Sequence, residues 1–257
     1  MLFRSEALEN VRVWFNQDNP PIALVCMPTG SGKTGIICCL PYFLGKVGLT
    51  KVPGNFPTGT PRHCFDKPVL IISPNLNITD QLESRMLTQS KDSNFFLRHG
   101  IVRDEEGRML PAGVKIEDTK KLNDPDSADS LKGYEVIIAN AQKFLKRETW
   151  EVELPDDFFK LVIVDEAHHF PAKTWTRIIK KFERHSYVVF FTATPYRGDK
   201  QPVVSSPYAF HLKLEDAVKR RIIRETNFVE ESTFALPDHL QFPREPTSEE
   251  QIGRAHV

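Results

Sequence analysis

A short apolar run followed by a glycine-rich turn sets the strongest constraint on the fold of this 257-residue chain. The run, Ile22-Ala23-Leu24-Val25-Cys26, follows Pro20-Pro21 and has the length and composition of a buried parallel strand. The turn reads Met27-Pro28-Thr29-Gly30-Ser31-Gly32-Lys33-Thr34 and opens into an apolar segment typical of a helix. A strand, a glycine-rich turn and a helix in this order predict a site that holds phosphate groups.

Each residue type in the turn suits this chemistry. Gly30 and Gly32 allow a tight turn whose N–H groups point inward, where a polyphosphate can sit. Lys33 carries positive charge for the β- and γ-phosphates, and the Thr34 hydroxyl is placed to ligate Mg²⁺. The alternative is a purely structural turn in which the Gly-Lys-Thr sequence arises by chance. We predict an ATP·Mg²⁺ site that comprises Pro28, Thr29, Gly30, Ser31, Gly32, Lys33 and Thr34.

Further apolar runs resemble the first, and helical stretches separate them. We expect strands at 69–72, 136–139, 161–164 and 187–191, and helices at 6–15, 35–44, 78–87 and 173–183. Strands that are apolar throughout and alternate with helices indicate an α/β fold, with a parallel sheet covered by helices on both faces.

Other segments give weaker patterns. We expect a strand near Phe95 to Val102, a turn at Glu105-Glu106-Gly107 and an exposed, mobile stretch from Asn123 to Ser130. The stretch from Lys46 to Lys67 is rich in Gly, Pro and Thr and indicates a loop or an exposed insertion.

Polar residues follow the predicted strands at the edge where ligands of such sheets bind. Asp165 and Glu166 come directly after one strand, close to where the turn would hold Mg²⁺ and the γ-phosphate. We predict that Asp165 is a direct or outer-sphere partner of Mg²⁺ and that Glu166 orients and deprotonates the attacking water. His168 is predicted to sense the γ-phosphate. One alternative is that the acidic pair has only a structural role and balances the dipole of a following helix. Another is a zinc site at His168 and His169.

The amino-acid composition excludes few classes of function. Lys and Arg together number 34, as do Asp and Glu, so any nucleic-acid binding must come from a local patch. Four cysteines (Cys26, Cys38, Cys39 and Cys64) lack metal-binding spacing and indicate core thiols in a reducing compartment. No run approaches a membrane span and no signal-peptide hydrophobic region opens the chain, so we predict a soluble, cytoplasmic protein.

Three motifs, in this order and at this spacing, resemble the first motor lobe of a superfamily 2 DEAD/DEAH-box helicase. They are Met-Pro-Thr-Gly-Ser-Gly-Lys-Thr, Asp-Glu-Ala-His-His-Phe-Pro and Phe-Thr-Ala-Thr-Pro-Tyr-Arg (191–197). Within that superfamily the chain is similar to type III restriction subunits and related DNA translocases. The resemblance implies a RecA-like lobe, here residues 1–225, that binds ATP and Mg²⁺ and grips nucleic acid.

The resemblance also implies roles for other residues. Thr192, Ala193 and Thr194 would couple the nucleotide to nucleic acid. Contacts to the nucleic-acid backbone would come from the set Ser73, Pro74, Asn75, Asn140 and Gln142. The family usually carries an arginine and a glutamine ahead of the first helix that recognise adenine. This chain offers Arg4 without the glutamine, so the resemblance leaves base selectivity open.

The C-terminal residues carry two further expectations. We interpret residues 226–251 as the start of a linker toward a second RecA-like lobe that is missing from this chain. We interpret Ile252 to Val257 as read-through of a common sequencing adapter, whose frame ATC GGA AGA GCA CAC GTC encodes Ile-Gly-Arg-Ala-His-Val and continues with the stop codon TGA. Codons incompatible with the adapter in the source DNA would remove this interpretation.

The sequence therefore predicts the N-terminal lobe of an ATP-dependent motor that acts on DNA more readily than on RNA, and that is inactive as an isolated fragment. An RNA helicase lobe is the nearest alternative. A P-loop small-molecule kinase and a catalytically silent interaction module are more distant ones. The Thr-Ala-Thr-Pro motif argues against the kinase, and the presence of Lys33, Asp165 and Glu166 argues against the silent module.

Overall fold

The structure is a computed structural model of the chain. It describes residues 2–17, 22–47, 67–74, 76–100, 113–116, 127–145, 151, 154–169, 172–196, 202–203 and 207–224. Residues Met1–Ile223 form one compact unit, and Arg224–Val257 are grouped as a second, of which only Arg224 is described.

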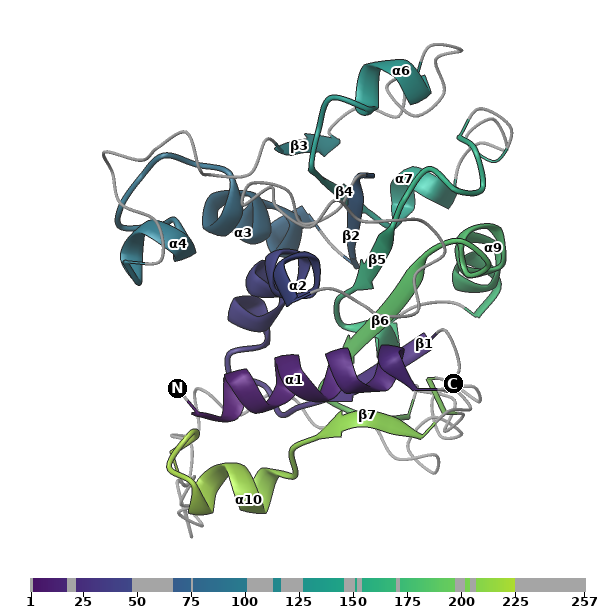
Figure 1. The fold of residues 1–257 in the computed structure, drawn as a ribbon. Coiled ribbons are helices and arrows are strands. Elements are labelled where there is room, and N and C mark those ends of the chain that lie inside the picture. The colour runs from purple at the N-terminus through teal and green to yellow at the C-terminus, as the bar shows by residue number, and fades with distance from the viewer. Residues whose placement is uncertain are drawn as a thin grey trace, which may run out of the picture. The chain divides into compact units, whose positions relative to one another are not determined.

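Seven parallel strands form one sheet in the order β3-β4-β2-β5-β6-β1-β7 (Figure 1). Parallel neighbours require crossover connections, which explains why helices separate most of the strands along the chain. The strands are β1 Ile22–Cys26, β2 Val69–Ser73, β3 Gly113–Ile116, β4 Val136–Asn140, β5 Leu161–Val164, β6 Tyr187–Thr192 and β7 Tyr208–His211. The predicted α/β fold with a parallel sheet is confirmed.

Alternate residues of the central strands enter two separate cores. Val25 of β1, Ile71 of β2 and Ile163 of β5 belong to the first, and their strand neighbours Leu24, Ile72 and Val164 belong to the second. Because both faces of the sheet are covered, these strands are apolar at every position.

The helices divide between the two cores. The first core receives side chains of α1 Leu2–Asn16, α2 Lys33–Val47, α3 Leu76–Met86, the short α4 Phe95–Arg98 and α10 Leu214–Lys219. The second receives those of α6 Ser127–Leu131, α7 Gln142–Leu145 and α9 Ala172–Phe182. Figure 1 shows α1, α2 and α3 on one side of the sheet and α7 and α9 on the other.

The expected strand from Phe95 to Val102 is wrong, because residues Phe95–Arg98 form helix α4. The buried Asn94 side chain accepts hydrogen bonds from the backbone N–H groups of Phe96 (2.8 Å) and Leu97 (3.2 Å). Such an N-cap stabilises the first turn of a helix and here prevails over the β-propensity of two phenylalanines.

Strands β3 and β7 and the short helices α6, α7 and α10 were not anticipated. Strand β3 is short, and its Lys115 forms ion pairs with Asp80 (3.0 Å) and Glu83 (2.8 Å) of α3. Strand β7 forms the other edge of the sheet. Helix α6 occupies the end of the stretch expected to be exposed and mobile; Asp129 and Ser130 within that stretch are exposed, and Leu131, just beyond it, is buried. The expected turn at 105–107 and most of the 46–67 loop lie outside the described residues.

Backbone hydrogen bonds hold neighbouring loops together where they leave the carboxyl ends of the strands. Met27 N donates to Thr192 O, Ala141 N donates to Ser73 O, and Asp165 N donates to Ile72 O, each at 2.9 Å. The loops that carry the predicted site residues are therefore fixed relative to one another. In the described part of the chain, no helix is long and apolar enough to cross a membrane.

Candidate active site

The glycine-rich turn has the conformation that phosphate binding requires. Gly30 (φ +79°) and Gly32 (φ +90°) adopt left-handed backbone conformations that other residues rarely tolerate. The Ser31 hydroxyl donates to Pro28 O (2.7 Å) and stabilises the turn, and α2 begins at Lys33. Thr29 and Gly30 of the turn are exposed to solvent. A turn of this kind at a helix N-terminus presents N–H groups to an anion.

Lys33 extends from the start of α2 toward the acidic pair. Its ammonium group donates to Met27 O (3.3 Å) and lies 3.3 Å from Glu166 Oε1. Only 8% of the residue is exposed, so these contacts compensate for the loss of hydration. The Glu166 carboxylate in this ion pair neutralises the charge of Lys33.

Asp165 is buried at the end of β5, with 5% of its surface exposed. One of its oxygens accepts a hydrogen bond from Glu166 N (2.9 Å). Burial raises the pKa of Asp165 from 3.8 to about 6; the charge of Glu166 adds to the rise and that of Lys33 opposes it. A cation bound beside this buried carboxylate would stabilise its ionised form.

Asp165 also lies close to α2. Ile163, two residues before it on the chain, enters the first core together with side chains of α2. Thr34 and Asp165, the two predicted magnesium ligands, are therefore on facing elements. The buried thiols of Cys26 and Cys38 confirm that these two cysteines belong to the core.

Glu166 has a left-handed backbone (φ +47°), which is uncommon for any residue with a side chain. One carboxylate oxygen lies by Lys33, and the other, Oε2, is 3.5 Å from His168 Nδ1. Oε2 is buried and has no hydrogen-bond partner. A buried, unsatisfied carboxylate oxygen beside a phosphate loop fits a site that receives water or a nucleotide.

His168 connects the acidic pair to the end of β6. Its Nδ1 lies 2.9 Å from Thr192 Oγ1. Because the Thr192 hydroxyl donates its proton to Thr194 O (2.6 Å), His168 must carry a proton on Nδ1 and act as the donor. The backbone N–H of Thr194 also donates to Thr192 Oγ1 (3.2 Å), so Thr192, Ala193 and Thr194 form a compact turn.

The structure thus brings Lys33, Asp165, Glu166, His168 and Thr192 together. The residues predicted to contact nucleic acid differ in how far their side chains are exposed. The Ser73 side chain is buried and bonds to Thr79 (2.6 Å), and buried Asn140 accepts from Gln142 N (2.8 Å). Pro74 is half-buried, the Gln142 side chain is exposed, and Asn75 lies outside the described residues.

Two residues of the site were missed by the sequence analysis. Met27 was named only as the first residue of the turn, yet its carbonyl accepts a hydrogen bond from Lys33 and its N–H donates to the carbonyl of Thr192. The Cys26 thiol lies 3.8 Å from Ala193 O. The Met27–Thr192 and Cys26–Ala193 contacts join segments far apart in the sequence, so no local pattern could have revealed them.

We expect replacement of Asp165 by Asn to stabilise the ligand-free protein at high pH. Because the pKa of Asp165 is raised, its contribution to stability is complete below its ordinary value of 3.8 and is lost as the pH rises through about 6. Above that pH the ionised group costs about 2 to 3 kcal/mol. Urea unfolding of both proteins at about pH 4 and about pH 8 should show a clearly larger stability gain for Asp165→Asn near pH 8, because most of the cost of ionising the buried group accumulates between these two pH values. Parallel pH profiles would contradict the assignment.

Together these features define a RecA-like domain of a nucleoside triphosphatase. Over residues 3–197 the chain matches the family described as type III restriction enzyme, res subunit, and it belongs to that family. The chain is accordingly a RecA-like lobe of the superfamily 2 helicase type, and the family is one of ATP-hydrolysing enzymes.

Three solved structures are similar to the chain. The Pyrococcus furiosus Hef helicase domain is 16% identical, with a TM-score of 0.46 over 87% of this chain and 36% of that one. The UvsW helicase from bacteriophage T4 is 16% identical (TM-score 0.45; 77% and 54%). The Sulfolobus solfataricus SWI2/SNF2 ATPase core in complex with dsDNA is 15% identical (TM-score 0.46; 75% and 31%). The chain therefore spans between 31% and 54% of the lengths of these structures. The comparison with curated proteins found no match.

Proposed function

We propose that the chain is the ATP-binding lobe of a DNA helicase or translocase. The observation that carries this proposal is the continuous set of contacts from Lys33 through Glu166 and His168 to Thr192. These contacts join the phosphate loop to the turn after β6. A group bound at the loop would change the position of Glu166 and so act on the neighbouring turn.

The glycine-rich turn binds the phosphates of ATP. Its N–H groups and the N-terminus of α2 hold the anion, and Lys33 moves its ammonium group from Glu166 to the β- and γ-phosphates. The exchange replaces one charge pair by another, so Lys33 stays neutralised throughout. Glu166 is thereby released as a carboxylate.

Thr34 and Asp165 fit a magnesium ion, because a hydroxyl and a carboxylate on facing elements are oxygen ligands of the kind it prefers. When bound, Mg²⁺ neutralises negative charge on the phosphates. Asp165 ionises more readily beside such a charge, which offsets the burial that raises its pKa.

Glu166 orients the attacking water and accepts its proton. The Oε2 atom is buried and has no hydrogen-bond partner, so it is available to a water at the γ-phosphate. His168 Nδ1 lies 3.5 Å from the same oxygen, and its hydrogen bond to Thr192 connects Glu166 to the turn formed with Ala193 and Thr194. These three residues are the proposed coupling segment.

Nucleic acid is proposed to bind at the same carboxyl edge, through the ends of β2 and β4. The Ser73 and Asn140 side chains are buried and hydrogen-bonded, so they stabilise the backbone at this edge. Pro74, Asn75, exposed Gln142 and backbone N–H groups would meet the phosphates. DNA is favoured over RNA by the restriction-subunit family to which the chain belongs. RNA is the second candidate.

A second RecA-like lobe is proposed to complete the motor. In such motors the γ-phosphate lies between two lobes, and an arginine from the second can raise the rate by roughly 10³ to 10⁵. Residues 1–225 form the first lobe in this proposal and 226–251 lead toward the other. The chain on its own is then expected to bind ATP·Mg²⁺ but to hydrolyse it slowly.

Binding of duplex DNA tests the nucleic-acid assignment. We expect weak, sequence-tolerant binding that falls steeply, by roughly 10² or more between 50 and 200 mM salt if several phosphates are contacted. Anisotropy titrations with two unrelated duplexes and a matched RNA duplex would measure it. Affinity that is insensitive to salt would contradict backbone contacts, and a preference for the RNA duplex would favour the second candidate.

A further inference from the structure

The first turn of α1 places Arg4 directly against the phosphate loop. A β-carbon built on Gly32 would lie 2.7 Å from Arg4 Nη2 and 3.0 Å from Arg4 Nε. The guanidinium group therefore occupies the space that a methyl group on Gly32 would need. Absence of a side chain at Gly32 permits this close approach as well as the left-handed turn.

A second observation places the positive charge of Arg4 on the same side of the site. Burial raises the pKa of the Cys39 thiol on α2 to about 11, and the charge of Arg4 acts in the opposite direction. Cys39 lies two turns from the start of α2. Arg4 thus faces both the loop and the helix that follows it.

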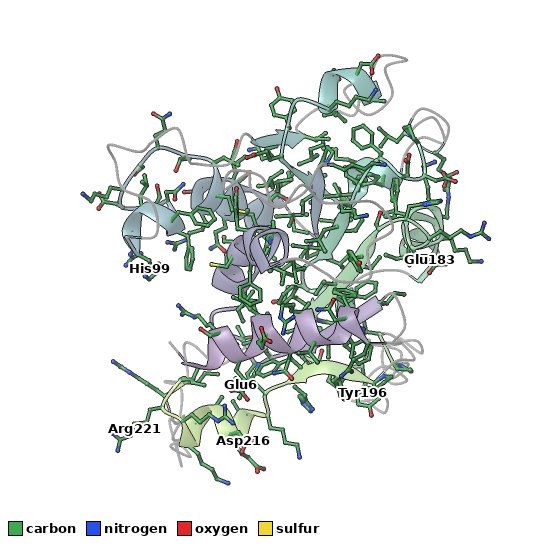
Figure 2. The ribbon with its side chains drawn as sticks, viewed as in Figure 1. Glu6, His99, Glu183, Tyr196, Asp216 and Arg221 are labelled. Atoms are coloured by element: carbon green, nitrogen blue, oxygen red, sulfur yellow. The ribbon has the colours of Figure 1, made fainter. Side chains whose placement is uncertain are left out.

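Helix α1 is anchored near the same residue. Glu6 forms an ion pair with Arg220 (2.9 Å), which joins the first turns of α1 to the end of α10. Figure 2 shows Glu6 on the side of α1 that faces α10. Ala7 and Val11 are fully buried in the first core. These contacts fix the start of α1, and with it the position of Arg4.

The contact with Gly32 bears on which part of a nucleotide Arg4 can reach. The N–H groups of the loop hold phosphates, whereas the base is separated from the β-phosphate by the α-phosphate and the ribose. A guanidinium in contact with the loop is therefore nearer to the phosphates than to the base. From the sequence, Arg4 was offered as a nucleotide-binding residue that stands without the glutamine with which the family usually recognises adenine.

We propose that Arg4 is a second cation of the phosphate site, which strengthens polyphosphate binding whatever base is attached. This inference rests on the proposed function of the loop. It makes Arg4 and Lys33 a pair of cations that approach the loop from α1 and α2. Selectivity among ATP, GTP and inorganic tripolyphosphate is then not set by Arg4.

The test is calorimetric titration of the full chain with ATP, GTP and inorganic tripolyphosphate, each with Mg²⁺. We expect Arg4→Gln to weaken all three by a similar factor, about tenfold, and Arg4→Lys to recover most of the loss because it keeps the charge. Arg12→Gln is the matched control: this α1 arginine is ion-paired with Glu9 and should leave all three affinities unchanged. Thermal unfolding of the variants checks that α1 is intact.

Three results would overturn the inference. Loss confined to ATP would make Arg4 a base-recognition residue, unchanged affinities would make it a bystander, and equal loss in Arg4→Gln and Arg4→Lys would show that its charge is not used. Failure of the wild-type chain to bind any of the three probes would instead overturn the proposed function itself.

Discussion

Glu166→Gln is expected to remove ATP hydrolysis while ATP binding is kept or becomes tighter. The carboxylate is needed to accept a proton from water, and its loss should lower the rate by roughly 10² to 10⁴. Binding should not suffer, because the amide no longer holds Lys33 in an ion pair or repels the γ-phosphate. Single-turnover assays with excess protein measure even the slow rate expected of one lobe.

Glu183→Gln is the matched control for that experiment. Glu183, labelled in Figure 2, directly follows α9, whose side chains enter the second core. It should leave both rate and affinity unchanged. If Glu166→Gln and wild type hydrolysed ATP at the same rate, Glu166 would not be the group that activates water.

Lys33→Ala is expected to have the largest effect on binding, with a loss of ATP affinity of about 100-fold or more. The variant removes the charge that meets the phosphates and leaves a partly buried Glu166 without its lysine partner. Both effects oppose an incoming polyanion. Lys67→Ala, which breaks an exposed pair with Asp157, is a control for general loss of a lysine.

A double variant separates the two effects of Lys33→Ala. If part of the loss comes from the unpaired Glu166 carboxylate, then Lys33→Ala combined with Glu166→Gln should bind ATP more tightly than Lys33→Ala alone. Fluorescence titration of the four proteins gives the coupling energy. Equal affinity of the double and single variants would show that Glu166 does not oppose the nucleotide in the absence of Lys33.

The sheet could be predicted because its strands are covered on both faces. Val69 to Ile72, Leu161 to Val164 and the other central runs are apolar without interruption, and the structure places strands at each of them. The edge strand β3 could not be predicted in this way. Its Lys115 is polar and is stabilised by ion pairs to α3, so the pattern lacks the apolar signal.

The site was only partly predictable for a related reason. Glycines and a lysine at fixed spacing identify the phosphate loop from local sequence, since one turn contains them all. The hydrogen bond of His168 to Thr192 and the contact of Arg4 with Gly32 join residues distant in sequence. Only packing determines such pairs: the sequence offered Arg4 as a nucleotide-binding residue, and the structure shows which part of the loop it contacts.

The most direct test of the central claim is calorimetric titration of the wild-type chain with ATP, in the presence and absence of Mg²⁺, beside Lys33→Ala. The account predicts one ATP site in the wild type, tighter with Mg²⁺, and a loss of about 100-fold or more in the variant. A wild-type chain that bound no ATP, or a Lys33→Ala chain that bound it equally well, would contradict a nucleotide site at the glycine-rich turn.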